Sequence, residues 1–84
     1  MTGFLAYSIA GHDKGKLYFI MREEQDFVYV SDGLIRPVEK LKRKNKKHIQ
    51  IIKNFGQRTN IESMTNEEVK RLIKVYCNGM KEVK

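Results

Sequence analysis

With 84 residues the chain has room for one small domain, and a domain of this size buries only about 60 to 65% of the surface that its unfolded chain would expose. An apolar fraction of 40% with eight aromatic residues argues against wholesale disorder, and the lack of a long apolar stretch argues against a membrane-spanning helix. The N-terminus lacks the features of a signal peptide and Cys77 is the only cysteine, so we expect a cytoplasmic protein without disulfides.

The net charge of +7 is concentrated in one segment. Residues 40–58 carry eight Lys/Arg and no acid, whereas the rest of the chain is nearly neutral. The densest part, residues 40–47, has six basic residues in eight positions and is followed by His48. Such density favours a polyanionic partner, because lysine and arginine neutralise phosphates and release counterions. A solvated segment that only keeps the protein soluble is the alternative.

The first half of the chain reads as short strands. Val28 and Val30 alternate with Phe27 and Tyr29, which is the period-2 pattern of a strand. Similar apolar runs, separated by turn residues, recur about every ten residues, and this spacing favours a small barrel that wraps closed. The predicted strands are residues 4–10, 16–21, 27–31, 34–38 and 48–52.

Turn chemistry separates these strands. Asp32-Gly33 stands between two apolar stretches and predicts a type I′ hairpin turn. Pro37 has no N–H to donate, so residues 34–38 are expected to form an edge strand. The basic segment then becomes a loop between the last two strands.

The C-terminal part predicts one amphipathic helix. Thr65 and Glu68 form a capping-box pattern, and a single apolar stripe follows, made of Val69, Leu72, Ile73, Tyr76, Met80 and Val83. We therefore divide the chain into a barrel at 1–53, a linker at 54–64 and a helix at 65–84. We expect the stripe to pack on the barrel, with a groove in a partner protein as the alternative.

Residues that could carry catalysis are few. His12 and Asp13 are adjacent, but the turn in which they lie needs Asp and Gly for backbone reasons alone. The acids at residues 23–26 lack the spacing of a calcium loop, and Cys77 has no ligand partner nearby. We expect no catalytic residues, no metal and no cofactor.

The stretch AGHDKGKLYFI resembles the KOW motif of ribosomal and transcription-factor domains, with Gly15 between two lysines after an apolar strand. With Asp32-Gly33, Arg36-Pro37 and the basic run that ends at His48, residues 4–52 resemble small bacterial KOW-domain RNA-binding proteins related to the fourteen-e family of large-subunit ribosomal proteins. The C-terminal helix lies outside the resemblance.

This resemblance implies a five-stranded SH3-like barrel that binds RNA, usually rRNA, without catalysis. A ribosomal or translation-factor protein is a further candidate partner, and a monomer is expected. The positions that match the basic residues of the family are the predicted RNA-binding residues: Lys14, Lys16, Arg36, Lys40, Lys42, Arg43, Lys44, Lys46, Lys47 and His48.

Two further expectations concern the partner. Tyr7, Tyr18 and Tyr29 alternate with core positions and are candidates for stacking on unpaired bases, or for simple padding of the barrel surface. The alternative function is an SH3-like protein-interaction module that docks through its C-terminal helix. Membrane binding is not expected, because the basic run has too few apolar residues to insert.

Overall fold

The computed structural model describes the backbone of residues 1–82, and the side chains of all of these except residues 54 and 79–82. Five strands are followed by one α-helix, with three short 3-10 turns between them. Their bounds are β1 Leu5–Ser8, β2 Leu17–Glu23, β3 Phe27–Ser31, β4 Lys42–Asn45, η1 Lys46–His48, β5 Ile49–Ile52, η2 Lys53–Phe55, η3 Ile61–Ser63 and α1 Asn66–Glu82.

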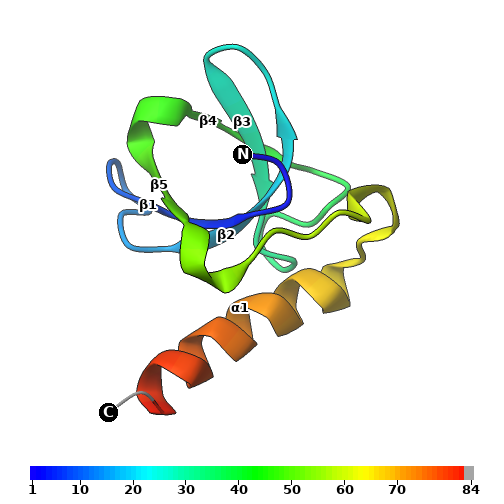
Figure 1. Ribbon diagram of the computed structural model, residues 1–84. Helices are drawn as coiled ribbons and strands as arrows, with labels where there is room; N and C mark the ends of the chain where they lie inside the picture. The colour runs from blue at the N-terminus through cyan, green and yellow to red at the C-terminus, as the bar shows by residue number, and fades with distance from the viewer. Residues whose placement is uncertain (83–84) are drawn as a thin grey trace.

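The five strands form one antiparallel sheet in the order β4-β3-β2-β1-β5. β1 lies between β2 and β5, so Leu5 stands opposite Phe19 on one side and Ile52 on the other. A register shift between Ile20 and Arg22 marks a bulge, which increases the bend of β2. The sheet curves strongly, and η1 connects its two edge strands, β4 and β5 (Figure 1). The predicted mainly-β architecture with a C-terminal helix is confirmed.

The strand predicted at 34–38 is wrong, and so is the type I′ turn before it. That turn needs positive φ at both central residues, whereas among the described residues only glycines, Gly33 included, have it. The carboxylate of Asp32 instead accepts hydrogen bonds from the backbone N–H groups of Leu34 and Arg36, at 2.9 and 2.8 Å. These bonds fold residues 32–36 into a compact loop. The remaining strand, β4, is formed by the basic segment itself.

Two apolar clusters fill the opposite faces of β1 and β2. Successive side chains of a strand point to opposite faces, so Leu5 and Ala6 belong to different clusters. Burial of each large apolar side chain stabilises the fold by about 1.5–3 kcal/mol. The cluster on the face away from α1 contains Ala6, Tyr18, Ile20, Val28, Val30 and Ile49. The cluster covered by α1 contains Leu5, Phe19, Ile52, Met64 and Val69.

Helix α1 begins with the predicted capping box, which is confirmed. The backbone N–H of Glu68 donates to the Thr65 hydroxyl, and the backbone N–H of Thr65 donates to the Glu68 carboxylate, both at 3.2 Å. Val69 is fully buried against the sheet, and Leu72 and Ile73 pack beside it. α1 therefore lies against one face of the sheet (Figure 1), with Val69, Leu72 and Ile73 of its apolar stripe packed on the core. The side chain of Met80, which is also part of the predicted stripe, lies outside the described residues. The end of the predicted helix at residues 83–84 lies outside the described residues.

Gly33 allows the 32–36 loop to approach α1 closely. Its φ of +76° is a conformation that L side chains rarely adopt, and a Cβ atom there would lie 2.6 Å from the backbone oxygen of Asn66. The side-chain amide oxygen of Asn66 in turn accepts a hydrogen bond from the backbone N–H of Val38, at 2.7 Å. The loop and the helix thus form one continuous surface.

Over residues 1–82 no helix is long and apolar enough to cross a membrane.

Candidate nucleic-acid interface

The basic segment forms the edge strand β4, and this divides its side chains between two faces. Because the side-chain period of a strand is two, Lys42 and Lys44 share one face while Arg43 lies on the other. Lys44 is only 8% exposed, whereas Arg43 is exposed to solvent. The prediction of a loop at this position is therefore wrong. The lysines of the basic segment therefore differ in their exposure to solvent.

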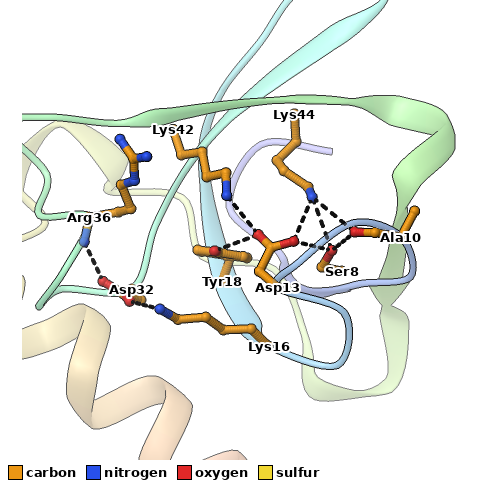
Figure 2. A network of polar contacts seen from close by, with 9 residues as sticks. All are labelled: Ser8, Ala10, Asp13, Lys16, Tyr18, Asp32, Arg36, Lys42 and Lys44. Carbon is orange, nitrogen blue, oxygen red and sulfur yellow. Dashed lines mark hydrogen bonds and ion pairs between the residues drawn. The ribbon is translucent and has the colours of Figure 1, made fainter.

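Asp13 holds both inward-facing lysines (Figure 2). Its Oδ1 accepts a hydrogen bond from Lys44 Nζ and its Oδ2 accepts one from Lys42 Nζ, each at 3.0 Å. The Tyr18 hydroxyl donates to Oδ2 at 2.7 Å, and the Ser8 hydroxyl donates to Oδ1 at 2.9 Å. The turn between β1 and β2 is thereby fixed to β4, although these segments are far apart in sequence.

Burial and hydrogen bonding have opposite effects on the pKa of Asp13. Burial raises the pKa of Asp13, but hydrogen bonds from Tyr18, Lys42, Lys44 and Ser8 outweigh it and hold the pKa well below the usual range. Burial, together with the hydrogen bond to Asp13, raises the pKa of the Tyr18 hydroxyl above its ordinary value. Asp13 is therefore ionised over the physiological range and compensates the buried Lys44 ammonium.

This arrangement predicts a specific loss of stability in acid. The pKa of Asp13 is lower in the folded than in the unfolded chain, so its carboxylate stabilises the protein fully above about pH 5, and this stabilisation is lost as the pH falls further. We expect the free energy of unfolding to fall more steeply between about pH 5 and 2 in the wild type than in Asp13→Asn. Urea unfolding at a series of pH values measures this difference, and parallel curves for the two proteins would contradict the prediction.

Two more of the predicted RNA-binding lysines make internal ion pairs. Lys16 Nζ lies 2.7 Å from Asp32 Oδ2, and Lys46 Nζ lies 2.7 Å from Glu23 Oε2. The hydrogen bond from Lys46 contributes most to lowering the pKa of Glu23, to about 2. Four of the ten predicted residues are therefore paired with acids from other segments. Residues 40–58 contain no acid, so the acids that pair with Lys42, Lys44 and Lys46 come from earlier in the chain.

The other six predicted residues are exposed and make no ion pair with the described side chains. The Arg36 guanidinium points away from Asp32, to which this residue gives only its backbone N–H (Figure 2). The Arg43 guanidinium lies over the ring of Phe27, 4.6 Å from the centroid, which holds the side chain flat on the outer face of the sheet. These six residues, here called the outer basic surface, are Lys14, Arg36, Lys40, Arg43, Lys47 and His48.

Four residues of the outer basic surface follow one edge of the sheet. Lys40 precedes β4, Arg43 lies within it, and Lys47 and His48 lie in η1 directly after it. The backbone holds η1 in place, because the N–H of Ile9 donates to the carbonyl of His48 at 2.9 Å. Exposed cations on a fixed backbone can contact successive phosphates of a nucleic acid.

The three tyrosines are less available than the strand pattern indicated. Tyr18 is buried and donates to Asp13, so the expectation that it faces outward is wrong. The Tyr29 hydroxyl donates to Glu24 at 3.1 Å, and the Arg22 guanidinium lies 4.9 Å from the centre of its ring. Tyr7 is 37% exposed. Tyr7 is therefore the most open of the three to a stacked base.

Sequence spacing does not indicate Ser8, Asp13, Glu23 and Asp32 as partners of the basic residues. The spacing of Lys42 and Lys44, two residues apart, indicates only that both would share one face of a strand. No group of three or more His, Cys, Asp or Glu side chains that could hold a metal occurs in the described part of the chain.

A comparison with known protein families finds no match, and a search of curated proteins finds no significant relative.

Proposed function

We propose that this protein is a non-catalytic RNA-binding protein of KOW type, built on an SH3-like barrel, that contacts phosphates through the outer basic surface. The observation that carries the proposal is the separation of charges along β4 and η1. Asp13 pairs with both inward lysines, Lys42 and Lys44, while Arg43 and Lys47 on the outside make no ion pair with described residues. The excess positive charge is thus presented along one edge.

The strand order and connections support the SH3-like part of the proposal. β1 pairs with both β2 and β5, and a single 3-10 turn, η1, connects β4 to β5 across the bend of the sheet. The resemblance of residues 4–52 to KOW proteins makes structured RNA, rRNA above all, the proposed ligand, in the cytoplasm and with the protein as a monomer.

The RNA proposal is tested by replacing three cations of the outer basic surface. Lys40→Gln/Arg43→Gln/Lys47→Gln removes phosphate contacts without breaking an internal ion pair, so the slope of log affinity against log salt should become shallower by about 2 to 3. Lys42, Lys44 and Lys46 are unsuitable because their substitution also removes ion pairs of the fold. Filter binding to a hairpin RNA over a salt series measures the slope.

The matched control changes the net charge equally on helix α1. Lys70→Gln/Arg71→Gln/Lys74→Gln should leave the slope within about 1 of the wild type. Equal losses in both triple variants would mean that only net charge matters, and an unchanged slope in the first would overturn the proposed RNA surface.

The alternative, an interaction module that docks through its C-terminal helix, has less support. Val69 is fully buried against the sheet, and Leu72, Ile73 and Tyr76 pack on the same apolar cluster. From Val69 to Tyr76 the apolar stripe of α1 is thus used within the domain.

A further inference from the structure

A groove of about 340 Å³ lies where the 32–36 loop, the start of β2 and the middle of α1 meet. Apolar side chains from all three elements line it: Leu17, Leu34 and Ile73. Leu34 is 69% exposed, and the neighbouring Ile35, at the same loop tip, is 72% exposed. Exposed aliphatic side chains beside an apolar groove are typical of a protein-binding surface.

The loop that carries these two side chains is held in a fixed conformation. The Ser31 hydroxyl donates to the carbonyl of Arg36 at 2.8 Å and accepts from the N–H of Gly33 at 3.0 Å. Asp32 binds the N–H groups of Leu34 and Arg36. A surface fixed before binding loses little conformational freedom when a partner binds. The exposure of Leu34 is therefore a stable property of the loop.

Lysines surround the apolar floor of the groove. Lys16, Lys70 and Lys74 line it, and its only lining acid among the described residues, Asp32, is already bound by Lys16 and by backbone N–H groups. Lys70 makes only an exposed contact with Glu67, at 3.2 Å, and such a pair is weak in solvent. The groove therefore has an apolar centre and a positive border.

From this combination we infer that the groove binds a protein segment with an apolar side chain flanked by acidic residues. The apolar side chain would lie against Leu17, Leu34 and Ile73, and the acids would pair with Lys70 and Lys74. Nucleic acid fits this floor less well, because its apolar lining residues are all aliphatic and offer no aromatic ring on which a base could stack. The groove shares no lining residue with the outer basic surface.

Selection from a random peptide library displayed on phage tests this inference. Clones are selected on the wild-type protein after depletion on Leu34→Ser/Lys74→Glu, which alters the centre and the border of the groove. We expect the enriched peptides to share an aliphatic or aromatic residue with Asp or Glu on both sides. No enrichment, or enriched peptides without acids, would overturn the inference.

Single variants then locate the binding of a synthetic enriched peptide by fluorescence polarisation. Leu34→Ser should weaken it at least about tenfold, and Lys74→Glu about fivefold. Arg71→Glu, with the same charge change on the same helix but outside the groove, should change it less than about twofold. Equal effects of Lys74→Glu and Arg71→Glu would overturn the proposed site.

Other occupants give different results in the same proteins. If a single-stranded RNA shifted the amide resonances of Leu17, Leu34 and Ile73, the groove would be part of the RNA site. If light scattering showed a wild-type dimer and a Leu34→Ser monomer, its occupant would be a second copy of the chain. Either result would overturn the assignment to an acidic protein, while the Lys40→Gln/Arg43→Gln/Lys47→Gln variant tests the RNA proposal separately.

Discussion

Replacing Asp13 with alanine should destabilise the protein by about 3 kcal/mol or more, because it leaves the buried ammonium of Lys44 without a counter-charge. The same change removes the acceptor of the hydrogen bonds from Lys42, Tyr18 and Ser8. For a domain of this size, the midpoint of thermal unfolding should fall by at least about 10 °C. Circular dichroism during heating, together with urea unfolding, measures both quantities.

Replacing Lys44 instead of Asp13 should lower the free energy of unfolding much less. In Lys44→Met the Asp13 carboxylate keeps Lys42, Tyr18 and Ser8, so we expect a loss of no more than about 1.5 kcal/mol. In the Lys44→Met background, Asp13→Ala should then cost about 1–2 kcal/mol less than in the wild type. If the two changes were additive, Lys44 would not depend on Asp13 for compensation, and the proposed role of the ion pair would be wrong.

Introducing a carboxylate at Val69 should unfold much of the protein. Val69 is fully buried between α1 and the sheet, where an unpaired charge has no partner, so Val69→Asp should cost more than about 3 kcal/mol. The large effect follows from the fold, in which residues of α1 complete one of the two apolar clusters. Chemical denaturation followed by circular dichroism measures the loss.

Val75 provides the control on the same helix. It is 50% exposed, and valine and aspartate have similar helix propensities, so Val75→Asp should change the stability by less than about 0.5 kcal/mol. If Val69→Asp were as stable as Val75→Asp, α1 would not belong to the core. The helix would then be a docking element, as in the alternative function.

Local chemistry made parts of the fold predictable. The alternation of Phe27, Val28, Tyr29 and Val30 predicted β3 with its observed bounds, and the capping box placed the start of α1 at the right position. The Asp32-Gly33 pair misled, because the same side chain that favours a hairpin also bonds the backbone of a wider loop. The hydrogen bonds from the backbone N–H groups of Leu34 and Arg36 to Asp32 favour the wider loop, and the spacing of residues in the sequence does not reveal these bonds.

The candidate site was predictable in composition but not in arrangement. The density of Lys and Arg indicated a charged surface, yet a highly charged segment was not expected to form a strand, so the inward direction of Lys44 was missed. Its partner Asp13 is 31 residues away in sequence, and only the pairing of strands brings the two together. A contact between such distant segments is a property of the topology, which local patterns do not encode.

The pairing of β1 with β5 also governs how the domain can fold. Leu5 must meet Ile52, and Val69 must then cover the same cluster, so no early segment of the chain contains a complete core. Contacts between distant residues incur the entropy of closing a long loop before they add stability. We therefore expect folding to be cooperative and slow for a chain of this length, with a partly synthesised chain held as an open, unstructured ensemble until the helix has emerged.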